Sequence, residues 1–303
     1  MNAIDDGTAG AAGPQPASRR PQRKRELQDS LNHYLYHPLA WQLARLLAKT
    51  PITPNMVSVI GAMFVIGAGI AYAQPWGTAG AALGMALHMT WHVVDGADGD
   101  LARMTGRSSP IGEMVDGLCD YLSHVVLYLI LGWLLSHQYG NASWWLTVIA
   151  GLSHALQSNH VEVQRRQYQW WYYGTPWIRH SHGEQDAATR KGVFGWLVSL
   201  YLAAATGMTP YAARIDEVAE AAATDPALRE RLHAAVRAEA RPLLQFLKVL
   251  GPNPRAIVLG LSMLAGSPLY YMLYQAVALN LLLAVSVVLH NRAAKRMAAE
   301  ISA

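Results

Sequence analysis

The charged residues of this chain are separated from long apolar windows, and this pattern constrains the fold more than any other feature. Residues 256–290 contain no Asp, Glu, Lys or Arg, whereas residues 1–30 and 160–255 hold much of the charge. Of the 303 residues, 52% are hydrophobic and 15% are charged, against roughly a quarter charged in a typical soluble domain. The sequence therefore predicts an all-α polytopic membrane protein.

Six transmembrane helices are predicted from the apolar windows. Their approximate bounds are 55–74, 77–94, 114–136, 143–161, and two helices within 256–290 that are broken near Gly266-Ser267-Pro268. The fifth is the shortest. Residues 192–208 are also apolar but number only about 17, the lower limit for a crossing, so we expect an interfacial helix there.

The chain divides into five predicted segments. Residues 1–25 are rich in Gly, Ala and Pro and then basic, which is typical of a disordered tail. Residues 26–50 mix apolar and polar groups at helical spacing and include Tyr34, Tyr36 and Trp41, so they predict an amphipathic helix at the cytosolic interface. The other three segments are a core with spans one to four (51–191), a polar helical cytosolic insertion (192–253), and the last two spans with a basic C-terminus (254–303).

The distribution of charge excludes some partners and locations. The formal net charge is +4, but the basic groups lie at segment ends, which fits anionic lipid headgroups better than nucleic acid. The basic run SRRPQRKR (18–25) is not followed by the apolar core of a signal peptide, so we expect a cytosolic N-terminus whose charges are solvated or contact anionic lipid. The one cysteine, Cys119, is expected to pack within a helix.

Six acidic side chains lie in VVDGADGDLARMTGRSSPIGEMVDGLCD (93–120), between two apolar windows. Asp95 and Asp98 are three residues apart, and Asp116 and Asp120 are four apart, so each pair shares one face of a helix. Four carboxylates in a small space repel one another, and burying one uncompensated charge costs several kcal/mol. One or two divalent cations remove that conflict, and the oxygen ligands suit Mg²⁺ or Mn²⁺ bound together with a substrate phosphate.

Small residues and an arginine accompany the aspartates. Pro110 and Gly112 mark the turn and the start of the second helix, which would bring the two pairs together antiparallel. Gly99 and Ala102 leave room for a ligand to approach the first helix closely. Arg103, one turn after Gly99, can bind a phosphate oxygen.

At these residues the sequence resembles the CDP-alcohol phosphotransferases (CDP-alcohol phosphatidyltransferases, class I), integral membrane enzymes of phospholipid synthesis. Their signature, D-x2-D-G-x2-A-R-x8-G-x3-D-x3-D, is complete here. Its fixed positions are Asp95, Asp98, Gly99, Ala102, Arg103, Gly112, Asp116 and Asp120. The resemblance covers roughly residues 50–165 and implies a six-helix membrane domain, usually a homodimer, with its site facing the cytosol.

The resemblance also implies residue roles. Asp95, Asp98 and Asp116 would bind two Mg²⁺ or Mn²⁺ ions, and Asp120 would act as the general base while also touching metal. The donor, a CDP-linked alcohol that releases CMP, would lie against Pro54, Asn55, Gly99, Ala102, Arg103, Ser109 and Gly112. The expected location is a bacterial inner membrane.

Two sub-classes of the family differ in which substrate carries the lipid, the CDP-linked donor or the acceptor alcohol. We favour CDP-diacylglycerol as donor with a soluble polyol acceptor; the alternative is CDP-choline or CDP-ethanolamine with a lipid alcohol. The wording DGADGDLAR resembles the alternative sub-class, but the histidine that follows its third motif aspartate is replaced here by Gly117. The predicted acceptor-binding residues are Arg165, Arg166 and Arg179, for which ordinary positive-inside anchoring is the competing interpretation.

Three histidines and the polar insertion each allow more than one interpretation. His124, one turn beyond Asp120, either packs between helices or reaches the site, and His180 and His182 are expected to be interfacial. The insertion could cover the cytosolic mouth of the site or form a dimer contact. A cation-coupled transporter is a remote alternative, but it predicts inverted repeats, and the sequence has no visible repeat. The sequence does not identify the acceptor or choose between Mg²⁺ and Mn²⁺.

Overall fold

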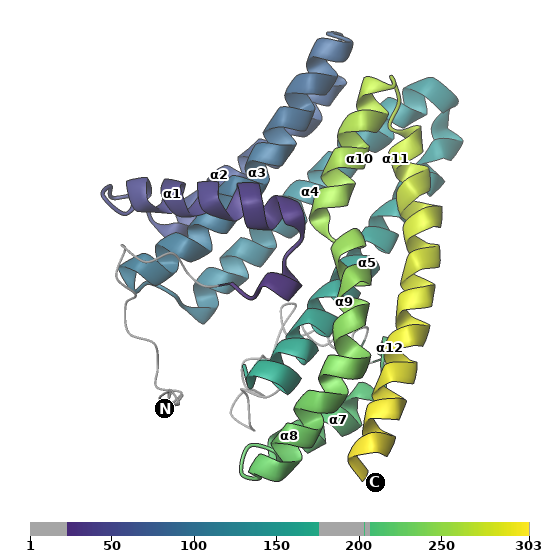
Figure 1. The fold of residues 1–303 in the computed structure, drawn as a ribbon. Helices are drawn as coiled ribbons and strands as arrows, with labels where there is room; N and C mark the ends of the chain where they lie inside the picture. The colour runs from purple at the N-terminus through teal and green to yellow at the C-terminus, as the bar shows by residue number, and fades with distance from the viewer. Residues whose placement is uncertain (1–22, 176–202, 204–206, 303) are drawn as a thin grey trace. The chain divides into compact units, whose positions relative to one another are not determined.

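The computed structural model describes residues 23–175, 203 and 207–302, and these are helical with no β-strand among them (Figure 1). The chain divides within one long helix, α4, into two compact units. Unit 1 is Met1–Leu131 and unit 2 is Gly132–Ala303. The all-helical class predicted from the sequence is confirmed for the described residues.

Unit 1 begins with short helical turns and then has four α-helices. In chain order they are η1 (Arg25–Leu27), η2 (Asn32–Tyr36), α1 (His37–Leu47), α2 (Pro54–Ala73), α3 (Thr78–Thr105) and the first part of α4 (Pro110–Tyr139). Thr53 starts α2 by accepting a hydrogen bond from the Met56 N–H, and Pro54 stands in the first turn, where no N–H donor is needed. α3 ends at Gly106, whose φ of +66° is the left-handed conformation that favours glycine at a helix end.

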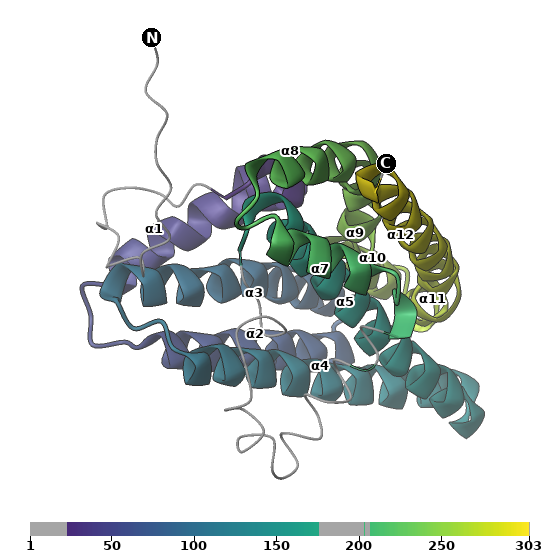
Figure 2. The ribbon, with the colours of Figure 1, turned by 90° about the horizontal axis from the view of Figure 1, so that it is seen from below.

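The core of unit 1 depends on small residues where helices approach each other. α1 packs against α3 through a cluster that includes Ala40, Ala44, Ala97 and Leu101 (Figure 2). α2 and α3 are close because Gly84 faces the ring of Tyr72, from which an added Cβ would lie only 2.5 Å away. These contacts hold the second half of α3, which carries the acidic stretch.

Unit 2 contains the end of α4 and the remaining helices. They are η3 (Asn141–Ser143), α5 (Trp144–Tyr173), α7 (Ala212–Ala221), α8 (Pro226–Ala235), η5 (Val236–Ala240), η6 (Arg241–Leu243), α9 (Leu244–Val249), α10 (Pro252–Leu264), α11 (Leu269–Leu273), η7 (Tyr274–Ala278) and α12 (Leu279–Ser302). The part of the predicted insertion (192–253) that the structure describes is helical. The predicted interfacial helix at 192–208 lies almost entirely outside the described residues, as do the tail at 1–22, Arg179, His180 and His182.

Three helices of the described chain are long and apolar enough to cross a membrane. They are Pro54–Ala73, Gly112–Tyr139 and Leu269–Ser302, with 20, 28 and 34 residues, and they correspond to the first, third and sixth predicted spans. The predicted break near Gly266 is confirmed, since α10 ends at Leu264, α11 begins at Leu269 and Gly266 has a φ of +88°. α10, the predicted fifth span, has only 13 residues, whereas a crossing needs about 20.

Candidate active site

The four signature aspartates come together in unit 1. Asp95 and Asp98 lie on α3, and Asp116 and Asp120 lie on α4. Asp95, Asp116 and Asp120 each offer one carboxylate oxygen, and these three oxygens lie within 4.8 Å of one another. The carboxyl group of Asp98 is close enough to that of Asp116 to share a hydrogen bond. The spacing of the two pairs and the turn between them therefore produce the antiparallel approach that the sequence predicts.

Neighbouring side chains orient two of these carboxylates. The Ser58 hydroxyl on α2 donates to Asp98 Oδ2 at 2.5 Å. The Trp91 indole N–H, one turn before the acidic stretch on α3, donates to Asp120 Oδ1 at 3.1 Å. Trp91 did not stand out in the sequence, because a tryptophan in an apolar window is equally expected to pack in a core.

The aspartate cluster has no positive charge of its own. Among the residues that the structure describes, none of the four aspartates forms an ion pair with Lys, Arg or His. Burial, together with the negative charge of Asp116, raises the pKa of Asp98 to about 8, and the hydrogen bond from Ser58 opposes that rise. A set of oxygen ligands this close together, without a protein cation, fits a hard divalent ion such as Mg²⁺ or Mn²⁺.

Most of the predicted donor-binding residues also lie together. The Ser109 hydroxyl accepts a hydrogen bond from the Gly112 N–H at 3.0 Å. A Cβ added to Gly112 would lie 3.2 Å from Ser109 Oγ and 3.5 Å from Asn55 Oδ1, so the starts of α2 and α4 meet here. On α3, a Cβ added to Gly99 would lie 3.4 Å from Nη1 of Arg103. Pro54 is in the first turn of α2, and Ala102 lies on α3 beside Arg103.

Sequence reasoning missed Asp100, which lies between the signature residues but is not one of them. Its carboxylate Oδ1 accepts hydrogen bonds from Arg103 at 2.5 Å and from Arg23 at 2.8 Å. The spacing of three residues between Asp100 and Arg103 was a signal that could have indicated this pair. Arg23 precedes Asp100 by 77 residues and no local pattern connects them.

The predicted acceptor-binding arginines are partly described. Arg165 and Arg166 lie on α5 in unit 2, and both pair with Glu162, at 2.5 and 2.6 Å. His124 lies beside the site on α4, where its Nδ1 donates to the carbonyl oxygen of Asp120 at 2.8 Å and its ring is 4.9 Å from that of Trp91. These contacts pack His124 against α3, which is one of the two roles expected for it.

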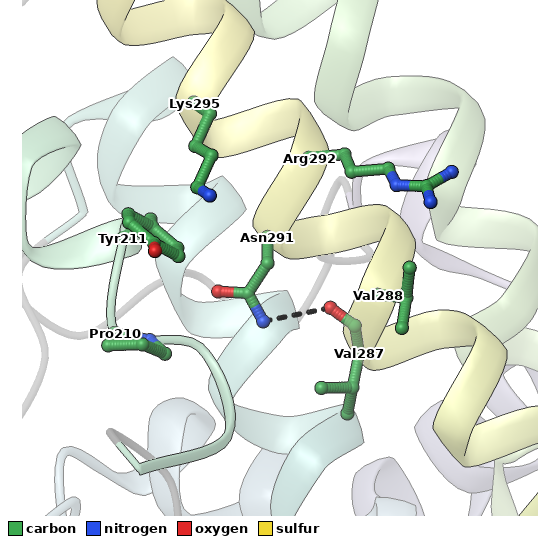
Figure 3. A pocket seen from close by; sticks show the side chains of 7 residues that line it. All are labelled: Pro210, Tyr211, Val287, Val288, Asn291, Arg292 and Lys295. Carbon is green, nitrogen blue, oxygen red and sulfur yellow. Dashed lines mark hydrogen bonds between the residues drawn. The ribbon is translucent and has the colours of Figure 1, made fainter.

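A small cavity in unit 2 is chemically different from the aspartate cluster (Figure 3). Its volume is about 280 Å³, and its lining residues are Pro210, Tyr211, Val287, Val288, Asn291, Arg292 and Lys295. Asn291 donates to the carbonyl oxygen of Val287 on the same helix at 2.9 Å. Among the described residues, the lining has no carboxylate and none of the residues predicted to bind metal or donor.

Comparison with protein families identifies the family of the domain that carries this site. Residues 51–177 match the family model of the CDP-alcohol phosphatidyltransferases. This part of the chain is a CDP-alcohol phosphatidyltransferase domain. The matched residues contain the whole signature, so the resemblance inferred from the sequence is confirmed.

The family fixes the general chemistry of the domain. Its members are transferases that move a phosphatidyl group from a CDP-alcohol to another alcohol, and they use a divalent metal. Residues 51–177 thus form an enzyme domain of this class. Together with the three long apolar helices of the chain, the domain identifies an integral membrane protein of phospholipid synthesis. The remaining residues, 178–303, lie outside the match.

Proposed function

We propose that the enzyme transfers the phosphatidyl group of CDP-diacylglycerol to the hydroxyl of a soluble polyol and releases CMP. The observation that carries this proposal is the group of aspartate oxygens within 4.8 Å of one another, inside a domain whose family acts on CDP-alcohols. Gly117 supports the choice of donor, because it stands where the aminoalcohol sub-class has a histidine.

In the proposed reaction the acceptor oxygen attacks the phosphorus atom that carries diacylglycerol. A new P–O bond forms, the P–O bond to CMP breaks, and CMP leaves with the bonding electron pair. Asp120 takes the proton of the acceptor hydroxyl, and the Trp91 N–H holds Oδ1 of that carboxylate in place.

Asp95, Asp98 and Asp116 would hold the divalent metal, with Asp120 touching it as well. A pair of Mg²⁺ or Mn²⁺ ions, when bound, neutralises the pyrophosphate and stabilises both the entering and the leaving oxygen. Ser58 fixes the direction of the Asp98 carboxylate, so that its oxygen is already oriented before the ion arrives.

The proposed donor site consists of two groups of residues beside the aspartates, one on α3 and one at the starts of α2 and α4. Arg103 binds a phosphate oxygen above Gly99, where a Cβ would lie in van der Waals contact with the guanidinium. Asn55, Ser109 and Gly112 bind the nucleotide at the starts of α2 and α4, and Pro54 and Ala102 line the approach. For a phosphorylated polyol, Arg165 and Arg166 are the proposed acceptor ligands, and their pairing with Glu162 restrains both guanidiniums.

The rest of the architecture belongs to the same proposal. The chain would have six crossings, of which α10 would be the shortest with 13 residues. It would lie in a bacterial inner membrane as a homodimer and present the aspartates to the cytosol. Residues 26–50 would lie on that face, and residues 192–253 would either cover the site or join two copies.

The test is CMP release by the purified protein in detergent with Mg²⁺ or Mn²⁺. CDP-diacylglycerol would be offered with a panel of polyols, and CDP-choline and CDP-ethanolamine with lipid alcohols. We expect release with CDP-diacylglycerol only, and a loss of about a hundredfold or more in Asp120→Asn, the size of a general-base contribution. Glu113→Gln is the matched control, because Glu113 is exposed on the same helix. Absence of release with every pair, from folded protein that binds metal, would overturn the proposal.

A further inference from the structure

The segment before η1 places a second arginine beside the signature arginine. Arg23 and Arg103 both donate to Oδ1 of Asp100, at 2.8 and 2.5 Å. The Asp100 side chain is only 2% exposed, so this carboxylate is buried between the two guanidiniums. The basic run that the sequence assigned to solvent or lipid is therefore tied, through Arg23, to the helix that carries the signature.

Arg23 is held there by more than its ion pair. The buried Gln28 side chain donates to the carbonyl oxygen of Arg23 at 2.9 Å and to that of Lys24 at 3.3 Å. Its Oε1 in turn lies 2.9 Å from Nδ1 of His37, the first residue of α1. Because α1 packs against α3, the position of Arg23 is coupled to the core of unit 1.

The charge of this group is unbalanced in a way that suits an anion. Two guanidiniums share one carboxylate, which leaves one net positive charge. Arg23 and Arg103 keep 29% and 44% of their side-chain surface exposed. Each guanidinium has five N–H donors, and within the described part of the chain only one of them is used, by Asp100. Paired guanidiniums with unused N–H groups are a typical site for phosphate oxygens.

The group also adjoins the proposed donor site. Arg103 lies over Gly99, and Gly99 follows the metal-binding candidate Asp98 directly. We propose that Arg23 and Arg103 together bind the pyrophosphate of the CDP-linked donor, and that Asp100 is the positioning residue for both. This inference rests on the proposed function and adds a ligand from outside residues 51–177, the part that matches the family.

The test measures CDP binding to the full-length protein in detergent at a fixed Mn²⁺ concentration. We expect Arg23→Ala to weaken CDP binding about tenfold or more, as for loss of a hydrogen bond to a charged group. Arg25→Ala is the matched control. Arg25 is two residues away in the same segment, but its guanidinium donates to the carbonyl oxygen of Gln28 and lies 5.7 Å from the Tyr34 ring centre, so its variant should bind CDP as the wild type does.

The affinity for Mn²⁺ alone, measured on the same variants, separates a phosphate ligand from a structural anchor. Weaker CDP binding with unchanged Mn²⁺ affinity supports the inference. Unchanged CDP binding, or an equal loss of CDP and Mn²⁺ binding, overturns it. If Arg23→Ala does not fold, Arg23→Gln keeps a donor for Asp100 without the charge, and wild-type CDP affinity in that variant overturns the inference. Failure of the wild type itself to bind CDP would overturn the proposed function as well.

Discussion

The two units both bury polar and charged groups, but they balance them differently. In unit 2, the buried Arg255 donates to Ser158 Oγ at 2.6 Å and to Gln157 Oε1 at 3.2 Å. In unit 1, like charges are concentrated, and within the described residues no cation pairs with the aspartate cluster. Groups that satisfy one another stabilise a fold, whereas a buried excess of one charge needs a ligand. The difference separates a structural network from a binding site.

The network of unit 2 also explains how its helices recognise one another. The amide of Gln157 on α5 donates to the carbonyl oxygen of Gln275 at 3.0 Å and to Asn280 Oδ1 at 2.8 Å. Asn280 donates back to Ser153 on α5 at 2.7 Å. In a bilayer, apolar surfaces gain little by leaving lipid, so hydrogen bonds of this kind help to specify which helix faces pack.

The most direct test of the difference between the two units is to remove one charge from the aspartate cluster. Asp95→Asn should lower CMP release about a thousandfold, because losing a metal ligand removes several kcal/mol of transition-state stabilisation. The same change should raise the thermal midpoint of the metal-free protein, since it relieves repulsion. Activity assays and thermal unfolding in a chelator measure the two effects. A variant that is less stable without metal would show that the cluster is structural.

In unit 2 the corresponding change should act on stability alone. Gln157→Ala removes the oxygen that accepts a hydrogen bond from the buried Arg255 and the amide N–H groups that donate to Gln275 and Asn280. We therefore expect a loss of about 3 kcal/mol in unfolding free energy. Mn²⁺ affinity should not change. Gln245→Ala, an exposed glutamine on α9, is the control and should differ from wild type by less than about 0.5 kcal/mol. Equal stability of both variants would contradict the assignment.

A smaller effect is expected from the support of the cluster. Ser58→Ala removes the hydroxyl that donates to Asp98 Oδ2 at 2.5 Å, and loss of such an outer contact typically weakens metal binding about tenfold. Titration with Mn²⁺ measures this change. Thr90→Ala serves as the control, because Thr90 is exposed on α3 and its hydroxyl donates to the carbonyl oxygen of Ala86 in its own helix. If Ser58→Ala bound Mn²⁺ with wild-type affinity, Ser58 would have no role in metal binding.

The features that the sequence predicts well are those that depend on neighbours along the chain. Pro54 and Pro110 start α2 and α4, and Gly266 ends a helix with a positive φ. The two aspartate pairs follow from spacings of three and four residues, which place side chains on one helix face. The turn between α3 and α4 is short, so their approach is nearly determined by local geometry.

The features that it misses depend on contacts between distant segments. Arg23 reaches Asp100 only because Gln28 and α1 hold its segment against α3. The pairing of Arg165 with Glu162 has a spacing of three residues, but a spacing alone does not distinguish an ion pair within one helix from an arginine that faces a ligand. The apolar composition on both sides of Gly266 indicated two spans, but the first of the two helices, α10, has only 13 residues.

The smallest expected effect is the release of protons from the aspartate cluster when metal binds. Asp98 lies beyond the predicted second span and has a pKa of about 8 because of burial and the charge of Asp116, so below that pH its carboxyl group is mostly protonated without metal. Metal binds the carboxylate, so Mn²⁺ binding should release more protons at pH 7 than at pH 9. Calorimetry in buffers of different ionisation enthalpy counts these protons.

The serine variant provides the control for this count. The Ser58 hydrogen bond lowers the pKa of Asp98, so Ser58→Ala should raise that pKa and extend proton release to higher pH. A proton count near zero at pH 7 in both proteins would mean that Asp98 is already ionised. The cluster would then carry its full repulsion without metal, and Asp98→Asn should stabilise the metal-free protein as strongly as Asp95→Asn does.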